Sequence, residues 1–496
     1  MIYTAISIYV LNVICDVVLM FNSLLFTLLI FFKKKYIIYG MEKKNKTICA
    51  ISTPPGAGGI SIIRVSGDDS LKIASKIFSS KNNDDLIKNP RKLILGKIKT
   101  KVFTDTCLAV YFKSPNSYTG EDMVEFQCHG GSAVCEGVFN AAIEAGAAVA
   151  EAGEFTKRAF VNGKLSLDEA EGVIDIINSE SESEVRAGTG LLNGNLKSQI
   201  EKMQNVLTTL LAKVEVSIDY PEEELEDETS IEVKEELLKI KKDCEEILFN
   251  SKTGVKVKSG YRVGIIGKTN VGKSSLLNAM LNYNKAIVTN ISGTTRDLVE
   301  DTYVYNGVKF NLIDSAGIRE TDDIVEKIGI EKSKELIDVS DIILFVVDGS
   351  EDLENDEIEI MKKLSNKNAI LVINKSDLFN KNDIVSKIND FWNKDLIFIS
   401  AKEVKGVVDL KDKIFNMLID KKVLNSLLLT NVRHIDLIKK AVDCVVRAIG
   451  AVDSGLTLDM VSIDIQDAWN FLGEITGVSN TEEIVNTIFS KFCVGK

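Results

Sequence analysis

Short apolar runs alternate with polar, glycine-containing loops through the middle of the chain, over residues 262–419. Each run has the length of a strand buried on both faces, and helical spacing of apolar residues begins after the first run, at Leu276 and Leu277. This alternation predicts an α/β domain with a mostly parallel sheet. The runs are 263–266, 310–313, 369–373 and 396–399.

Helical periodicity dominates both flanks of this domain. Residues 165–251 are rich in Leu, Glu, Lys and Ala, and Ser166 and Glu169 form a capping-box pattern before the first periodic stretch. The acidic stretch 219–224 predicts a loop between helices, and helical spacing returns over 423–496. We expect the two flanks to pack as one discontinuous bundle that the α/β domain interrupts; two separate helical units are the alternative.

Residues 47–160 have a different pattern. Strand-like runs such as 60–65 and 108–112 alternate with turns such as Pro54-Pro55-Gly56, which predicts an α+β domain. Two glycine-rich segments, 53–59 and 128–131, are each either a ligand-binding loop or a tight turn.

The chain begins with an almost continuously apolar stretch, residues 1–32, followed by Lys33, Lys34 and Lys35. The stretch is long enough to cross a bilayer, and the lysines would keep the following domains on the cytosolic side. It lacks the basic n-region and the cleavage site of a secretory signal. We favour a natural start at Met41, with a membrane anchor as the alternative. Mass spectrometry of the native N-terminus would distinguish the two.

Length predicts about three folding units after this extension. The predicted boundaries are 1–40 for the extension, 41–160 for the α+β domain, 161–257 and 421–496 for the two parts of the helical domain, and 258–420 for the inserted α/β domain.

Composition narrows the possible partners. The net charge is −12, from 60 basic and 72 acidic residues, so contact with RNA would need a local basic patch or a partner. The lysine-rich run 252–258 is a candidate patch or a solvated linker. Scattered cysteines without a C-x-x-C pair, and only two histidines, give no sign of a disulfide framework or a zinc site.

Residues 267–274, Gly-Lys-Thr-Asn-Val-Gly-Lys-Ser, match the phosphate-binding P-loop in the strand–loop–helix setting that the motif requires. Glycines let backbone N–H groups turn toward an anion, and the helix N-terminus adds a positive dipole. We expect Lys273 to reach the β- and γ-phosphates and the Ser274 hydroxyl to bind Mg²⁺.

Three further stretches, each after a predicted strand, indicate that the nucleotide is GTP. Residues 314–317, Asp-Ser-Ala-Gly, place a carboxylate toward Mg²⁺ and an N–H donor toward the γ-phosphate. Asp377 ends the stretch 374–377, Asn-Lys-Ser-Asp, and its carboxylate can accept hydrogen bonds from the N1–H and 2-amino groups of guanine but not from adenine. The backbone of 400–402, Ser-Ala-Lys, can meet guanine O6.

The hydrolytic residues depart from those of a Ras-like switch. Ile318 stands where such proteins carry a glutamine that orients the attacking water, and isoleucine cannot orient water. Arg296 and Arg319 lie nearby in the sequence, but neither can be assigned as an arginine finger.

Residues 286–297, Ala-Ile-Val-Thr-Asn-Ile-Ser-Gly-Thr-Thr-Arg-Asp, resemble switch I of the MnmE (TrmE) family of tRNA modification GTPases. The resemblance extends over 47–496, although Ala152 stands where the family commonly has proline. The other stretches that resemble family signatures are 53–59, 115–122, 128–131, 153–156 and the C-terminal Phe-Cys-Val-Gly-Lys, 492–496.

The resemblance implies a catalytic arrangement for the G domain. In the family K⁺ takes the place of an arginine finger when two G domains pair, and its ligands map to Asn270, Thr289, Ile291 and Thr294. Thr295 maps to a Mg²⁺ ligand beside Ser274, and the water-activating glutamate maps to Glu326, which the residues alone would leave as a solvated helix charge. Together with Lys273 as a catalytic residue, the motifs and the resemblance give this GTP-binding set: Asn270, Val271, Gly272, Lys273, Ser274, Ser275, Thr289, Asn290, Ile291, Ser292, Gly293, Thr294, Thr295, Asp314, Ser315, Ala316, Gly317, Asn374, Lys375, Asp377, Ser400, Ala401 and Lys402.

The resemblance also implies a second ligand, a 5-formyl- or methylene-tetrahydrofolate bound by the N-terminal domain. Its contacts map to Arg64, Glu125, Lys164 and Lys496. A carboxylate suits the amino and ring N–H groups of a pterin, and the cations suit glutamyl carboxylates. Cys493 is a candidate reactive thiol, or else a small buried hydrophobe.

The implied activity is potassium-dependent GTP hydrolysis by a cytoplasmic homodimer without stable membrane association. With the flavoprotein MnmG, in a heterotetramer, it would add a carboxymethylaminomethyl or aminomethyl group to C5 of the wobble uridine (position 34) of certain tRNAs. One alternative is a GTP-driven assembly factor such as a ribosome-biogenesis switch, which would not need the N-terminal domain or the cysteine tail. Another is a membrane-attached GTPase of the ferrous-iron-transport type, against which the lack of further apolar spans argues.

Overall fold

The computed structural model describes residues 46–80, 86–219, 223–282, 300–314, 336–378, 388, 391–424 and 428–496. They form two compact units. Unit 1 holds the described parts of Met1–Ile174, Gly188–Glu246 and Arg433–Lys496, and unit 2 holds those of Asp175–Ala187 and Ile247–Val432. The predicted extension, 1–40, lies outside the described residues, and none of the helices within them is both long and apolar enough to cross a membrane.

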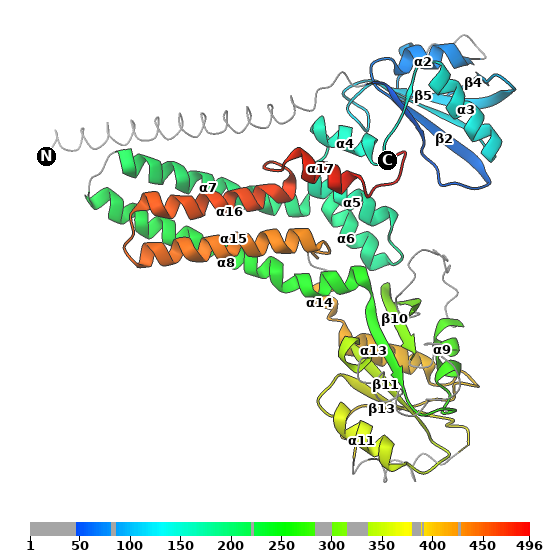
Figure 1. Ribbon diagram of the computed structural model, residues 1–496, viewed down its shortest axis with the longest axis vertical. Helices are drawn as coiled ribbons and strands as arrows, with labels where there is room; N and C mark the ends of the chain where they lie inside the picture. Colours follow the sequence, from blue (N-terminus) through cyan, green and yellow to red (C-terminus); the bar gives the residue numbers. More distant parts are fainter. Residues whose placement is uncertain are drawn as a thin grey trace. The chain divides into compact units, whose positions relative to one another are not determined.

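The N-terminal part of unit 1 is a seven-stranded sheet in the order β3-β4-β5-β6-β2-β1-β7, antiparallel except where β1 meets β7 (Figure 1). Helices α2 (Ser70–Ile77) and α3 (Ser132–Glu144) pack on one face and enclose its core with Ile63 and Val65. The strands are β1 Ile48–Ile51, β2 Gly58–Ser66, β3 Phe78–Ser80, β4 Ile94–Lys99, β5 Thr104–Phe112, β6 Met123–Gly130 and β7 Ala148–Val149.

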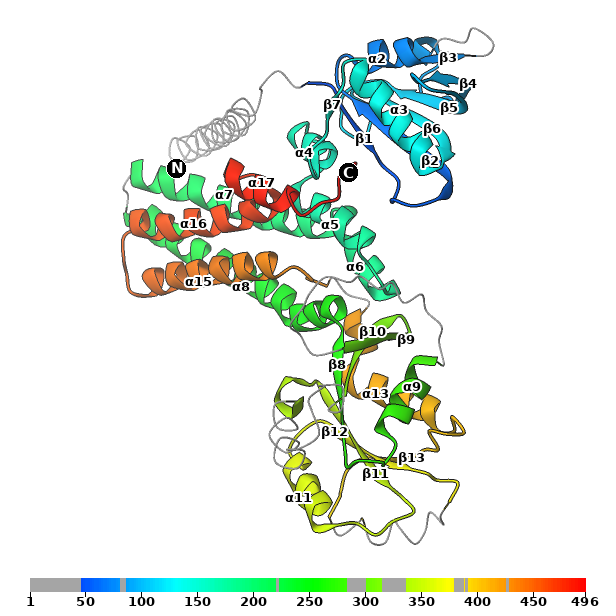
Figure 2. The ribbon, with the colours of Figure 1, turned by 45° about the vertical axis from the view of Figure 1, so that its right-hand side comes forward.

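The rest of unit 1 is helical and brings together segments from both ends of the chain. Helices α7 and α16 lie side by side, and the Gln204 side chain on α7 donates a hydrogen bond to the Trp469 carbonyl on α16 at 3.1 Å (Figure 2). The predicted discontinuous bundle is therefore present. Its helices are α4 Glu154–Val161, α5 Leu167–Ile177, α6 Glu182–Leu192, α7 Asn195–Asp219, α8 Glu223–Ser259, α15 Val432–Asp453, α16 Leu458–Thr476 and α17 Glu482–Phe489. The end of α5, the first part of α6 and the end of α8 are grouped with unit 2.

The acidic stretch 219–224 is predicted as a loop between helices, and its middle, 220–222, lies outside the described residues, between the end of α7 at Asp219 and the start of α8 at Glu223. Only the predicted ends of the loop are wrong, since Asp219, Glu223 and Glu224 belong to helices. The lysine-rich run 252–258 continues α8 rather than forming a linker, and two of its ammonium groups pair with carboxylates: Lys256 with Asp341 at 2.7 Å and Lys258 with Asp175 at 2.6 Å. These lysines are thus partly neutralised, which weakens the interpretation as a basic patch.

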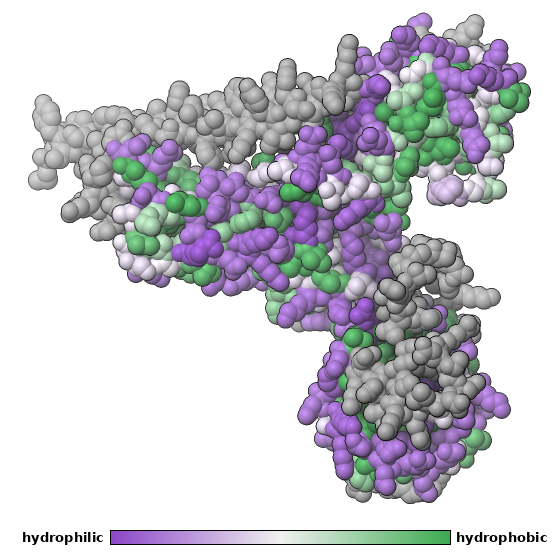
Figure 3. Space-filling model, in the orientation of Figure 1, coloured by the Kyte–Doolittle hydropathy of each residue, from purple (hydrophilic) through white to green (hydrophobic). Residues whose placement is uncertain are grey.

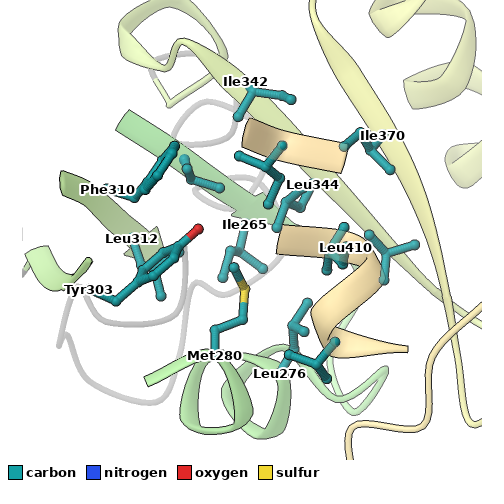
Figure 4. Packing of buried hydrophobic residues seen from close by; sticks show 14 of the residues in the cluster. Ile265, Leu276, Met280, Tyr303, Phe310, Leu312, Ile342, Leu344, Ile370 and Leu410 are labelled. Carbon is teal, nitrogen blue, oxygen red and sulfur yellow. The ribbon is translucent and has the colours of Figure 1, made fainter. Parts of the chain in front are cut away.

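Unit 2 contains the predicted α/β domain, a six-stranded sheet in the order β13-β12-β11-β8-β10-β9. All pairs are parallel except β9 with β10. Alternate residues of β11 enter two separate cores, which explains why the strand is apolar from Ile342 to Val347. The core between the sheet and helices α9 and α13 is shown in Figure 4. The elements are β8 Tyr261–Ile266, α9 Lys273–Asn282, β9 Glu300–Tyr305, β10 Val308–Asp314, β11 Ile342–Asp348, α11 Asn355–Leu364, β12 Ala369–Asn374, β13 Leu396–Phe398, α13 Val407–Leu418 and α14 Lys421–Leu424.

The segment Asp175–Ala187, which runs from the end of α5 into α6, belongs to unit 2 although it precedes the sheet by many residues. It holds the turn of the β9–β10 hairpin: the Ser183 backbone N–H donates to the Gly307 carbonyl at 2.9 Å, and Lys309 pairs with Glu180 at 3.3 Å. The compact units thus group residues across the predicted boundaries at 257 and 420, and the domain boundaries themselves stay a prediction.

Candidate functional site

The P-loop joins the end of β8 to the start of α9 and has the backbone that the motif requires. Asn270 and Gly272 have positive φ angles of 63° and 99°. A side chain at Gly272 would collide with the amide of Asn374, so only glycine fits this position. The loop can therefore turn its N–H groups inward beside the positive end of α9.

Lys273 is buried inside this loop. Its ammonium group donates hydrogen bonds to the carbonyl oxygens of Gly267 at 2.9 Å and Lys268 at 2.6 Å. Burial lowers the pKa of Lys273, and the negative charge of Asp314, at the end of β10, opposes that shift. The exposed hydroxyl of Ser274 and the Asp314 carboxylate are oxygen donors of the kind that Mg²⁺ prefers, so the described residues fit this ion.

Asn374 connects the P-loop to the predicted guanine-binding loops. It is 3% exposed, and its amide N–H donates to the Val271 carbonyl at 2.8 Å. Its side-chain oxygen accepts a hydrogen bond from the backbone N–H of Ala401 at 3.0 Å. One buried side chain therefore fixes the distance between the phosphate-binding and base-binding ends of the site.

The base-binding end is formed by the loops after β12 and β13. The Ser376 backbone N–H donates to the Ile399 carbonyl at 3.0 Å, which holds the two loops together. Asp377 is exposed, and a hydrogen bond from the Ser400 hydroxyl is the main cause that lowers its pKa. Its carboxylate therefore stays ionised at neutral pH and only accepts hydrogen bonds. Lys402 is exposed in the other loop, after β13, close in sequence to Ser400.

Sequence reasoning missed Asp348, the last residue of β11. Its carboxylate forms an ion pair with Lys375 and accepts hydrogen bonds from the backbone N–H and hydroxyl of Ser350, at 2.9 and 2.6 Å. The hydrogen bond to Asp348 raises the pKa of Lys375. An aspartate placed between an apolar run and Gly349 was the available signal, because the ends of parallel strands meet at one edge of the sheet.

The described residues thus bring together the P-loop, the end of β10 and both guanine-binding loops. The remaining predicted residues of the G site lie outside the described residues: Thr289, Asn290, Ile291, Ser292, Gly293, Thr294, Thr295, Ser315, Ala316, Gly317 and Glu326. Of the predicted K⁺ ligands only Asn270 is described, and its side chain is exposed.

A second polar cluster lies on the face of the N-terminal sheet opposite α2 and α3. The Arg64 guanidinium donates to the Glu125 carboxylate at 2.8 Å and to the Gly495 carbonyl at 3.5 Å, and it lies 5.4 Å from the centre of the Tyr118 ring. Burial lowers the pKa of Lys496, and the nearby Arg64 charge lowers it further. The structure therefore gathers three of the four predicted folate contacts, whereas the ammonium group of Lys164 donates to the Pro115 carbonyl at 3.1 Å.

The C-terminal tail is docked in this cluster by its backbone. Val494 forms an antiparallel bridge with Ala152, and the Ser52 hydroxyl donates to the Gly495 carbonyl at 3.1 Å. A side chain at Gly495, where φ is 93°, would collide with the Ile51 carbonyl. Cys493 is exposed, whereas the other described cysteines are buried, so the interpretation of Cys493 as a buried hydrophobe is wrong.

The two glycine-rich segments of the N-terminal domain meet in space. Gly58 pairs with Gly130 between β2 and β6, and a side chain at Gly130 would collide with the Gly58 carbonyl. Beside them lies a groove of about 630 Å³, lined by residues of 50–61, by α3 and by Val494 of the tail. On the face drawn in Figure 3, apolar surface gathers over this domain near α3. The segments thus combine a close backbone contact with the wall of a ligand-sized groove.

Two family models match the chain. One, described as the MnmE helical domain, matches residues 167–493, and the other, described as the GTP-binding protein TrmE N-terminus, matches residues 47–164. The tRNA modification GTPase MnmE of Clostridioides difficile (strain 630) is 42% identical over 456 residues, which cover 91% of this chain and 99% of that protein. The chain belongs to the MnmE family.

Other MnmE proteins agree. That of Acetivibrio thermocellus is 42% identical over 458 residues, covering 91% of this chain and 100% of its own length, and that of Ligilactobacillus salivarius is 40% identical with 91% and 98% covered. The predicted family, the multidomain fold class and the enzyme class, a GTPase, are thereby confirmed. The MnmE assignment also removes the assembly factor and the iron-transport GTPase as alternatives.

Proposed function

We propose that this protein is a potassium-dependent GTP hydrolase that modifies tRNA. Acting in the cytoplasm as a homodimer with an MnmG-type flavoprotein, it takes part in adding a carboxymethylaminomethyl or aminomethyl group to C5 of uridine 34 in certain tRNAs. The observation that carries this proposal is the guanine-nucleotide site, in which Asn374 joins the P-loop to the base-binding loop. The same chain carries a C-terminal tail with an exposed Cys493, and this tail is docked beside Arg64. The names of the relatives, tRNA modification GTPases, support it.

In the G domain, each residue of the proposed site has a distinct task. Lys273 holds the terminal phosphates, Asp377 reads guanine, and Asn374 keeps the two at a fixed spacing. Ser274 and Thr295 would hold Mg²⁺, and Asn270, Thr289, Ile291 and Thr294 would hold K⁺. When bound, Mg²⁺ would neutralise phosphate charge, and K⁺ would supply the positive charge that an arginine finger supplies in other GTPases. Glu326 then orients or activates the water.

In the N-terminal domain, Glu125 and Arg64 offer opposite charges at the edge of the tail, with Lys496 beside them. A pterin can donate its ring and amino N–H groups to a carboxylate, and a glutamyl chain can pair with the cations. These residues therefore suit a tetrahydrofolate that carries the one-carbon unit. The groove of about 630 Å³ is a separate feature, because its lining includes Val494 of the tail but none of these three residues.

Potassium should accelerate GTP hydrolysis by on the order of tenfold or more over sodium at equal ionic strength, because a correctly sized cation supports the charge that develops during hydrolysis. The measurement is phosphate release at rising protein concentrations in each salt. Asn270→Gly, which keeps the left-handed backbone but removes the side chain, should narrow the difference. Equal rates of the unaltered protein in both salts would contradict the potassium requirement.

Cells that lack this gene should lose the C5 modification at uridine 34. The experiment is nucleoside mass spectrometry of purified tRNA, with the deletion complemented by the unaltered gene or by an Asp377→Asn form. The unaltered gene should restore the modified nucleoside. The Asp377→Asn form should not restore it, because cells supply GTP and this variant should bind GTP poorly. An unchanged modification level in the deletion would remove the tRNA assignment and leave the GTPase assignment intact.

A further inference from the structure

Lys411 occupies a core position on α13 where the pattern of apolar residues predicts a hydrophobic side chain. The buried positions Val407, Leu410, Lys411 and Ile414 follow helical spacing along one face. Lys411 is 1% exposed, and burial lowers its pKa. Since burying an ammonium group costs stability that an apolar side chain would not, packing alone does not explain a lysine here.

The contacts of Lys411 join two elements of the G domain. Its ammonium group donates a hydrogen bond to the Met280 carbonyl at 2.7 Å, one of the last four carbonyls of α9, which have no partner within the helix. The same group lies 4.8 Å from the centre of the Tyr303 ring and 5.7 Å from that of Tyr305, both on β9, where the ring faces attract a cation. Met280, Tyr303 and Leu410 face one cluster in Figure 4.

The two elements that Lys411 joins border one segment of the chain. Helix α9 ends at Asn282 and β9 begins at Glu300, and residues 283–299 between them include the predicted metal ligands Thr289 and Thr295. We propose that Lys411 is a positioning residue for GTP hydrolysis, because its ammonium group fixes the end of α9 relative to β9 and so sets where the metal-binding segment leaves and re-enters the domain. The inference rests on the proposed function, since family resemblance assigns those ligands.

The variant Lys411→Met tests this proposal, because methionine keeps an unbranched apolar chain and removes the charge. We expect a melting temperature at least equal to that of the unaltered protein and an affinity for a fluorescent GDP analogue within about threefold, because the P-loop and guanine contacts lie elsewhere. At saturating GTP, kcat should fall by at least about tenfold and half-activation should need more K⁺, because small misplacements of catalytic groups are costly. Lys411→Arg keeps the charge and should recover part of kcat.

Lys413→Met is the matched control on the same helix, since Lys413 is more exposed and pairs with Asp395 at 2.7 Å. It should leave kcat and the K⁺ requirement unchanged. The proposal is overturned if Lys411→Met hydrolyses GTP as the unaltered protein does, with the same K⁺ dependence. It is also overturned if Lys411→Met unfolds, because the lysine would then be structural. Equal rates of the unaltered protein in K⁺ and Na⁺ would contradict the proposed potassium requirement and not the role of Lys411. In that case the ratio of kcat between Lys411→Met and the unaltered protein would still test Lys411.

Discussion

Replacing Lys273 with alanine should lower the rate of GTP hydrolysis by at least about a hundredfold, because one removed donor to the developing phosphate charge typically costs that much. The side chain is buried in the P-loop and held by the carbonyl oxygens of Gly267 and Lys268. These contacts hold the ammonium group within the loop to which the P-loop motif assigns the phosphates. Lys273→Arg should not restore the rate, because a planar guanidinium does not fit a site built around a compact ammonium group.

The measurement is single-turnover phosphate release, with nucleotide affinity measured separately by a fluorescent GDP analogue. Lys268→Ala is the matched control, since Lys268 lies in the same loop but pairs with Glu354 outside the phosphate site. Its rate should stay within about threefold of the unaltered protein, as expected for a surface ion pair. A Lys273→Ala form that kept more than about a tenth of the rate would show that the loop backbone alone carries the phosphate charge.

The strands and the phosphate loop of the G domain could be predicted because their sequence requirements are local. Runs predicted at 263–266, 310–313, 369–373 and 396–399 lie within or largely overlap β8, β10, β12 and β13. The predicted runs are mostly apolar because both faces of the sheet are covered. Since parallel strands end at one edge, the polar residues after them could be expected to form one site.

The contacts that join these loops could not be predicted, because they depend on which strands are neighbours. Asp348 pairs with Lys375 only because β11 lies beside β12. Lys411 lies in the core because α13 packs against the end of α9, where its ammonium group binds a carbonyl oxygen. Helical spacing alone predicts an apolar residue such as leucine at this position. Both residues carry charges in places where sequence patterns indicate only loop or core.

In the N-terminal domain too, local features could be predicted from the sequence, and contacts between distant segments could not. The sequence left each glycine-rich segment as either a binding loop or a tight turn. The pairing of Gly58 with Gly130 explains these two glycines by close backbone contact, and residues of both segments also line a groove. The register between β2 and β6 therefore gives these glycines a role that the sequence pattern did not indicate, close contact between two strands, and the binding role stays a prediction.

Replacing Asp377 with asparagine should change the preferred base from guanine to xanthine. The Asp377 carboxylate is exposed at the end of the site, and the Ser400 hydroxyl lowers its pKa, so it only accepts hydrogen bonds at neutral pH. Guanine presents two donors, N1–H and the 2-amino group, whereas xanthine has a carbonyl in place of the amino group. An asparagine amide matches xanthine by accepting from N1–H and donating to that carbonyl. GTP affinity should fall by on the order of a hundredfold or more, because a site built for hydrogen bonds rejects a mismatched ligand strongly.

Competition binding with GTP and XTP measures this exchange, and hydrolysis of XTP by the variant shows whether the phosphate end still works. Because Asn374 fixes the phosphate-binding loop independently of Asp377, the variant should hydrolyse XTP at a rate near that of the unaltered protein with GTP. Asp409→Asn, an exposed carboxylate in the first turn of α13, is the control and should leave the GTP preference unchanged. A variant that still preferred GTP over XTP would mean that backbone contacts at Ala401, rather than the carboxylate, select guanine.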